Sequence, residues 1–211
     1  IASTRSQLLK TVGVAGALGA AIYAGPVKAS MAFESAMADV VKVVDGLKDK
    51  STGELTEEYR KMKKELIDLS TKVPMAATEL TKIAASAGQA GIARQEIVRF
   101  AEDAAKMGVA FDTTADQAGE WMATWRTAFK MSQNEVVALA DKINYLSDTT
   151  NAKAPQISSI VSKVGPLGEM AGLASGEVAA LGATLVATGV QEDVAATGIK
   201  KLMTTMTAGN A

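Results

Sequence analysis

Residues 112–146 read DTTADQAGEWMATWRTAFKMSQNEVVALADKINYL, and this stretch predicts two helices joined by a short connection. Apolar residues recur at three- and four-residue steps through both halves, which is the period of an amphipathic α-helix. Asp112 or Thr113 is suited to cap the first helix, and Ser132 with Glu135 forms a capping box that opens the second. The positions expected to face inward are Ala118, Trp121, Met122, Trp125, Phe129, Val136, Leu139, Ala140, Ile143 and Leu146.

The aromatic side chains of the first of these helices mark the expected centre of the core. Aromatic residues make up 4% of the chain, and both of its tryptophans lie here. Large aromatic side chains dominate the apolar area that a core buries. Trp121, Trp125 and Phe129 are therefore predicted to anchor the core, with a ligand cage as the less favoured interpretation of the tryptophan pair.

The same helical period extends to the rest of the C-terminal part, and no segment alternates with the period of two that a strand requires. The fold class is therefore predicted to be all-α, a module of several short to medium helices. Helices are expected at 76–87, at 93–107 with an end at Gly108, around 157–164 with a stop at Gly165-Pro166, and at roughly 175–188 and 192–207. Their expected inward residues are Ile97, Phe100, Ala101, Ala104, Met107, Ile157, Ile160, Val161, Val164, Val178, Leu181, Leu185, Ala195, Ile199, Leu202 and Met206.

Two longer helices are expected between residues 31 and 74. The first follows Pro26, and Ser51 with Glu54 fits a capping box for the second. The second has a nearly heptad spacing that would suit a coiled-coil seam, but two heptads are too few to establish one. The expected apolar stripes are Phe33, Met37, Val40, Val41 and Val44, then Leu55, Tyr59, Met62, Leu66 and Leu69. We predict three regions, which are an Ala/Gly-rich apolar helix at 1–30, these two longer helices at 31–74 and a compact helical core at 75–211.

Composition excludes several kinds of chemistry. The chain of 211 residues contains no cysteine and no histidine. Disulfides, thiolate nucleophiles, sulfur-ligated zinc or iron and the usual serine triad are therefore ruled out. The 22 basic and 23 acidic residues nearly cancel, so charge provides no reason to expect sustained binding to nucleic acid. Because the chain begins at Ile1 rather than at a methionine, it is expected to be part of a longer protein.

Residues 11–27, TVGVAGALGAAIYAGPV, form an uncharged stretch between two lysines, which we call the apolar tract. Gly13, Gly16 and Gly19 recur every three residues, a spacing of small side chains that permits close contact between helices in water or in lipid. Three interpretations remain open: packing within a homo-oligomer, insertion into a membrane, and a secretory signal. Packing is favoured, because alanine and glycine contribute little transfer energy towards lipid.

Other candidate sites favour ordinary structural roles. The carboxylate pairs Glu57–Glu58 and Glu102–Asp103 are adjacent on helices, so their side chains diverge by about 100° and do not converge on one bond. The basic cluster at 60–64 is interleaved with glutamates, which favours a solvated helix face over a nucleic-acid site. We interpret the ten methionines as residues that fill the core, in preference to residues that line a binding groove. We predict no catalytic residue, no cofactor and no metal site.

An ordered series of segments resembles the tail tape-measure family of tailed bacteriophages, in the version found in contractile-tailed temperate phages and tail-like bacteriocins. The resemblance covers roughly residues 31–208, and it rests on the order of the segments because each alone is short. The segments include MAFESAMADVVKVV (31–44), FAEDAAKMGVAFDTTADQAGEWMATW (100–125), LADKINYLSD (139–148), IVSKVGPLGEMAGL (160–173), EVAALGATLVATGV (177–190) and EDVAATGIKKL (192–202).

The resemblance implies a structural protein that sets tail tube length during assembly, occupies the tube lumen in a few copies and leaves at genome ejection. Its implied partners are copies of itself, the tail tube and tip or baseplate hub proteins, tail assembly chaperones and the host membrane during ejection, with no specific nucleic acid. Its implied location is the virion tail, after assembly in the host cytoplasm. Two alternatives remain: a secreted or envelope-associated helical protein, and an enzyme with an oxygen-only site.

Overall fold

The computed structural model describes residues 27–168 and 171–209, and the long regular elements in these ranges are all α-helices. The predicted all-α fold class is therefore confirmed. The first described helix covers residues 27–43. The others are α2 (Glu57–Ser70), α3 (Ala77–Gln89), α4 (Arg94–Ala110), α5 (Ala115–Ala128), α6 (Gln133–Thr149), α7 (Ala154–Gly168), α8 (Ser175–Ala187) and α9 (Glu192–Ala208).

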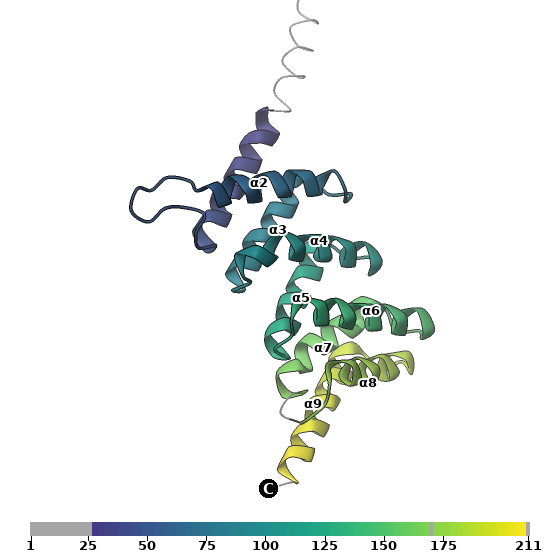
Figure 1. Cartoon of the computed structure of the whole chain (residues 1–211). Helices are drawn as coiled ribbons and strands as arrows, with labels where there is room; N and C mark the ends of the chain where they lie inside the picture. The colour runs from purple at the N-terminus through teal and green to yellow at the C-terminus, as the bar shows by residue number, and fades with distance from the viewer. Residues whose placement is uncertain (1–26, 169–170, 210–211) are drawn as a thin grey trace, which may run out of the picture.

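The helices α2 to α9 stack in two layers. One layer consists of α2, α4, α6 and α8, and the other of α3, α5, α7 and α9, with each member in contact with the next. Each helix also packs against the helix that follows it in the chain, so the stack advances steadily from α2 to α9 (Figure 1). This is the neighbour-to-neighbour arrangement of an α-solenoid, in which an element contacts only those close to it in the sequence.

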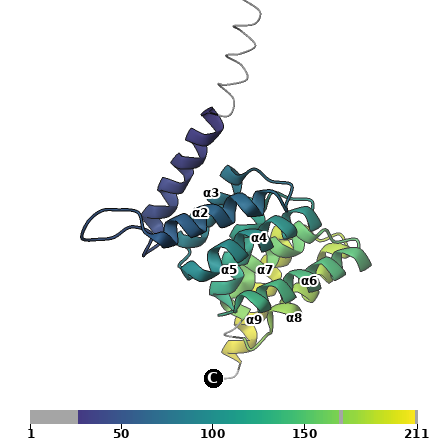
Figure 2. The same cartoon turned by 45° about the horizontal axis from the view of Figure 1, so that its top comes forward.

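Helix 27–43 adds to the N-terminal end of this stack. Its residues Phe33, Met37 and Val40 are buried, as is Val44 just after its end, in agreement with their spacing. Residues 27–32 are exposed, and Figure 2 shows the beginning of this helix projecting beyond the other helices. The helix therefore belongs to the stack through its second half.

One continuous core runs through the stack from Phe33 to Met203. The central helix is α7, which packs against α5, α6, α8 and α9. Its residues Ile157, Ile160, Val161 and Val164 are all fully buried, in agreement with the sequence pattern. A helix with neighbours on several sides must be apolar on more than one face, and α7 meets this requirement.

The capping box predicted at Ser51 and Glu54 is wrong. Helix α2 begins only at Glu57, and Thr56 caps it by accepting from the backbone N–H of Tyr59. Ser51 instead forms part of a loop in which the carboxylate of Asp49 accepts from the Ser51 backbone at 2.7 Å. Aspartate commonly stabilises such turns with its own side chain. Because Leu55 precedes the helix, it is exposed rather than buried.

Of the N-caps predicted for α5 and α6, the one for α6 is confirmed and the one for α5 is wrong. Neither Asp112 nor Thr113 caps α5; Thr114 does, by accepting from the backbone N–H of Gln117. Asp112 is in the left-handed region with φ 51°, which separates the end of α4 from this cap. The capping box of Ser132 and Glu135 at the start of α6 is confirmed.

Two glycines predicted to end helices lie inside them instead. Helix α4 continues past Gly108 to Ala110, and α7 continues through Gly165-Pro166 to Gly168. Both glycines allow close packing, since a Cβ on Gly108 would lie 3.0 Å from the Ala115 nitrogen and one on Gly165 would lie 3.0 Å from the Ala128 Cβ. Pro166 removes one backbone bond close to the helix end, where the loss affects little of the helix.

The last two helices are less buried than predicted. Their ends lie within a residue of those expected, and Val178, Ala195 and Ile199 are buried. Leu202 and Met206 were expected to face inward but are 49% and 47% exposed. Leu181 is also exposed, and Leu185 is half-buried. Among the described helices, α9 packs only against α7 and α8, which leaves part of its surface uncovered.

The contact at Gly165 predicts opposite effects of the same substitution in α7 and α9. Gly165→Ala should lower the free energy of unfolding by about 1–3 kcal/mol, because the Ala128 Cβ is fixed to its own backbone and cannot yield. Gly198→Ala should raise it by about 0.5–1 kcal/mol, because alanine favours the helix and an added Cβ meets no atom within 4 Å. Urea unfolding of both variants measures the difference, and equal effects would contradict the packing role.

Candidate functional site

Trp125 of α5 lies at the centre of the contact between α5 and α7. Its side chain is 0% exposed, and its indole Nε1–H donates to the Ser162 hydroxyl of α7 at 2.9 Å. An indole has a single donor, and burying that donor without a partner would be costly. Trp125 therefore contributes both apolar area and a specific bond to the joint between two helices of one layer.

Phe129 and Trp121 flank Trp125 and are only half-buried. Phe129 is the C-cap residue of α5, and its ring lies over two glycines of α7. A Cβ on Gly165 would lie 3.0 Å from the ring, and one on Gly168 would lie 3.2 Å from it. Of the three proposed core anchors, the structure thus places Trp125 inside the core and the other two at its edge.

A chain of polar contacts connects α4, α5 and α6. Arg126 of α5 forms an ion pair with Glu96 of α4 and donates to the Gln133 side-chain oxygen at 3.2 Å. The Gln133 amide in turn donates to Asp103 of α4 at 2.7 Å. Gln133 is 2% exposed, so this chain satisfies a buried amide that would otherwise be costly. The sequence reasoning missed Gln133, although it lies three residues before Val136 on the same helix face.

At the N-terminal end, Glu34 joins helix 27–43 to α2. Its carboxylate forms an ion pair with Lys63 and accepts from the Tyr59 hydroxyl at 3.2 Å. The hydrogen bond from Lys63 lowers the pKa of Glu34, and the same bond raises the pKa of Lys63. The charged forms of both groups are therefore favoured in the folded state.

At the other end, Lys163 joins α7 to the first turn of α9. Its ammonium lies 2.7 Å from both Glu192 and Asp193. The bond from Lys163 lowers the pKa of Asp193, and the bonds to Asp193 and Glu192 raise the pKa of Lys163. The two carboxylates also suit the positive end of the α9 dipole. These acidic groups therefore have a structural use in holding α9 on α7.

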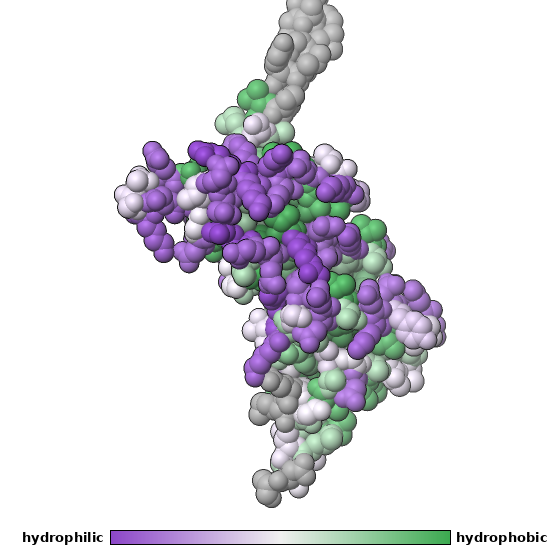
Figure 3. Space-filling view, in the orientation of Figure 1, coloured by the Kyte–Doolittle hydropathy of each residue, from purple (hydrophilic) through white to green (hydrophobic). Residues whose placement is uncertain are grey.

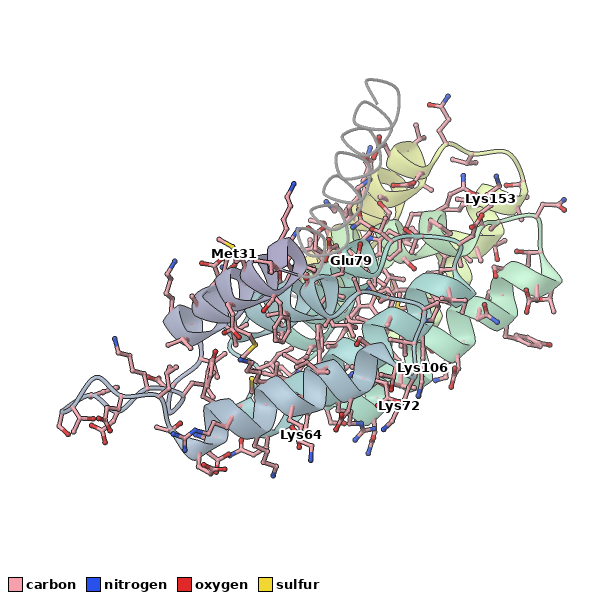
Figure 4. All side chains as sticks on the ribbon, turned by 90° about the horizontal axis from the view of Figure 1, so that it is seen from above. Met31, Lys64, Lys72, Glu79, Lys106 and Lys153 are labelled. Carbon is pink, nitrogen blue, oxygen red and sulfur yellow. The ribbon has the colours of Figure 1, made fainter. Side chains whose placement is uncertain are left out.

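Each of the adjacent carboxylates bonds to a different partner. In the ranges that the structure describes, no group of three or more acidic side chains is placed to hold a metal ion. In the basic cluster, Arg60 and Lys63 are used in ion pairs, and Lys64 projects from the outer surface of α2 (Figure 4). The partners of the carboxylates are Arg60 for Glu57, Arg94 for Glu58, Lys106 for Glu102 and Gln133 for Asp103.

Two clefts of the described surface, both beside α6, are mainly apolar. The most enclosed of the larger ones, of about 200 Å³, lies between α4 and α6, with Met107 and Met122 at its base and Asp103 and Asp141 at its rim. A more open hollow of about 620 Å³ lies between α6 and the start of α8. The polar side chains that line the open hollow are Asp141, Lys142, Tyr145, Ser175 and Glu177.

Residues 11–26 of the apolar tract, with Gly13, Gly16 and Gly19, lie outside the described residues. Among the helices that are described, none has the length and apolar character needed to cross a membrane.

The comparisons with known proteins agree with the resemblance found in the sequence. A family model described as "Phage-related minor tail protein" matches residues 63–211, which include the second half of α2 and all of α3 to α9. The chain belongs to this family. As a phage tail protein, it has a structural role in the tail.

A curated relative connects the family to tape-measure proteins. The chain is 31% identical over 215 residues to the "Probable tape measure protein" of Halomonas phage phiHAP-1. The match covers 98% of this chain and 24% of the relative, so the chain spans about a quarter of the relative's length. No solved structure matches the chain. The assignment to the phage tail tape-measure family is therefore confirmed.

The burial of Trp125 predicts a large difference between the two tryptophans of this tail protein. Trp125→Ala should lower the free energy of unfolding by about 3–5 kcal/mol, because it leaves a cavity and removes the bond to Ser162. Trp121→Ala is the matched control and should cost clearly less, because that ring is half-buried. Denaturant unfolding checks both, and a Trp125 variant as stable as the Trp121 variant would contradict this account.

The contact of Glu34 predicts a dependence of stability on pH. The folded pKa lies below the ordinary value of 4.5, so the contact stabilises the fold above that pH and is lost as the pH falls through the folded pKa. Between about pH 5 and pH 2, wild type should therefore lose up to about 1 kcal/mol more free energy of unfolding than Glu34→Gln, because the partly exposed pair is weak. Urea unfolding at several pH values tests this, and identical pH profiles would refute it.

Proposed function

We propose that this chain forms part of a tail tape measure that sets the length of the tail tube during assembly. In this proposal the protein occupies the tube lumen and leaves at genome ejection. The observation that carries the proposal is the match to the tape-measure relative over 98% of this chain. A match over nearly the whole chain cannot be explained by the chance similarity of one short motif.

Within such a protein, the described helices serve as a folded module rather than as the ruler itself. Stacked helices lie roughly 8–10 Å apart, so a pair of helices extends the stack by roughly 10 Å. A continuous helix of about forty residues would instead extend by roughly 60 Å. The layered arrangement of α2 to α9 therefore provides little length for each residue. We assign the ruler to extended helical sequence outside this module.

The proposed partners are other proteins of the tail. They are further copies of this chain, the tube and the tip or baseplate hub proteins, and the tail assembly chaperones. The host membrane is a partner during ejection, through the apolar tract. A catalytic role has no support in the arrangement of the carboxylates, which bond individually to basic and amide groups. The protein is proposed to act in the virion tail and not on a substrate.

The module and the ruler predict different effects on tail length. Deleting about forty residues from the extended helical part of the full tape measure should shorten tails by roughly 60 Å. Inserting about twenty residues between Thr52 and Gly53 should leave tail length unchanged, because both residues lie in an exposed loop that can expand outward. Electron microscopy of phage carrying each change in the tape-measure gene measures both lengths.

Unchanged tail length in several deletions of the extended part would overturn the ruler. A proportional lengthening by the loop insertion would overturn the assignment of residues 27–209 to a folded module. Yield of intact tails serves as the control for assembly, because only variants that assemble provide a length.

A further inference from the structure

The cleft between α4 and α6 has an apolar base that the helices of the stack leave open. Its volume is about 200 Å³, and we call it the α4–α6 cleft. Figure 3 shows apolar surface among the hydrophilic side chains on the face that α4 and α6 form. The apolar residues that line the cleft are Met107, Ala110, Phe111, Met122, Val137 and Ala140.

Both walls of the α4–α6 cleft are complete helices inside the stack. On one side α4 also packs against α2, and on the other side α6 also packs against α8. Met107 and Met122 at the base are themselves buried, so the base belongs to the core. The opening therefore does not lie where a further helix would continue the stack.

The volume of the α4–α6 cleft suits one large side chain. An apolar cavity of about 150 Å³ is enough to bind benzene. A cleft of about 200 Å³ can therefore hold a phenylalanine or leucine side chain, whereas a whole helix, which is about 10 Å wide, cannot enter it. The methionine side chains at the base are unbranched and adapt to the shape of the group that enters. The cleft is thus suited to a single apolar anchor.

The rim of the α4–α6 cleft carries negative charge. Asp141 of α6 is exposed, and within the described ranges no side chain forms a hydrogen bond or ion pair with it. Asp103 of α4 accepts from the Gln133 amide at 2.7 Å and lies 3.8 Å from Arg99, and both contacts use its Oδ2. The cleft therefore presents the carboxylate of Asp141 without a partner, and the Oδ1 of Asp103, beside an apolar base.

The two lysines nearby do not neutralise Asp141. Lys106 lines the cleft, but its ammonium donates to Glu102 of the same helix at 2.7 Å. Lys142 lines the hollow towards α8 and not this cleft. Its side chain lies over the first turn of α8, since a Cβ on Gly176 would lie 3.4 Å from it. A ligand in the cleft would therefore meet the charge of Asp141 uncompensated.

We propose that the α4–α6 cleft binds a segment of another protein chain in which a large apolar side chain is adjacent to a lysine or arginine. The apolar side chain enters the cleft, and the cation pairs with Asp141 at the rim. An acidic segment would bring like charges together, and a neutral segment would leave Asp141 without a partner as it loses water. The proposal does not depend on the protein setting tail length.

Two blocked dipeptides of opposite charge test the site. The probes are acetyl-Phe-Lys-amide and acetyl-Phe-Glu-amide, which share the ring and differ in the charge beside it. The methionine methyl groups of the chain are isotope-labelled, and NMR follows their signals as each dipeptide is added. Met107→Leu and Met122→Leu identify the two signals of the cleft. Because few atoms make contact, the dissociation constant is expected to be of the order of 1 mM.

The lysine dipeptide should shift the signals of Met107 and Met122 and should bind about three- to tenfold more tightly than the glutamate dipeptide. The reason is that the charge beside Asp141 changes from attractive to repulsive. Asp141→Asn should remove this preference, while both dipeptides still shift the two signals. Asp68→Asn is the matched control, because it removes an exposed carboxylate of α2 outside the cleft and should keep the preference. Ala140→Leu should weaken the binding of both dipeptides by filling the cleft.

Each of the following results would overturn the proposal, provided that circular dichroism shows the variants to be folded. Equal binding of the two dipeptides to wild type, or a preference that Asp141→Asn keeps, would show that Asp141 does not select the partner. Similar shifts of methionines outside the cleft, such as Met37 and Met203, would show unspecific apolar binding. No change up to about 20 mM would show that the cleft admits no side chain. None of these results involves tail length, so failure here is distinguishable from failure of the tape-measure proposal.

Discussion

The stack depends on the burial of α7. Because each helix contacts only its near neighbours, α7 is the main connection of the earlier helices to α8 and α9, together with the direct contact of α6 with α8. Four aliphatic residues of α7, Ile157, Ile160, Val161 and Val164, are fully buried. Burying each stabilises the fold by about 1.5–3 kcal/mol relative to exposure. The indole of Trp125 and the close approach at Gly165 fix how α5 lies on this helix, so that α7 determines both the strength and the geometry of the joint.

Polar contacts select which helices meet, while apolar burial supplies most of the stability. The pairs Glu34–Lys63 and Lys163–Glu192 join elements about thirty residues apart, yet their side chains remain partly exposed. Such pairs contribute little free energy in water. Gln133 is different because it is buried, and leaving its amide without partners would cost more than its bonds gain. These contacts therefore mainly destabilise wrong arrangements of the helices, in which the same polar groups would lack partners.

The stack has a direction, which matters for a protein of the phage tail. Its first helices are rich in charged residues, whereas α8 and the last turns of α9 contain few, so the two ends offer different surfaces to other tail components. A solenoid also changes length little when residues are added to its loops. In the function proposed above, both properties suit a module that contacts its neighbours in order rather than one that measures length.

The sequence by itself determined the all-α class, the approximate helix positions and most of the inward residues of α4, α6 and α7, because the helical period is a local property that repeats along each segment. It also identified the capping box at Ser132, since both partners lie within one turn. Only the tertiary structure decided that Gly108 and Gly165 lie inside helices, that Gln133 is buried and that Leu202 and Met206 are exposed. The physical reason is that each of these outcomes depends on how closely a second helix approaches, and the spacing of apolar residues along one helix carries no information about the distance to its neighbour.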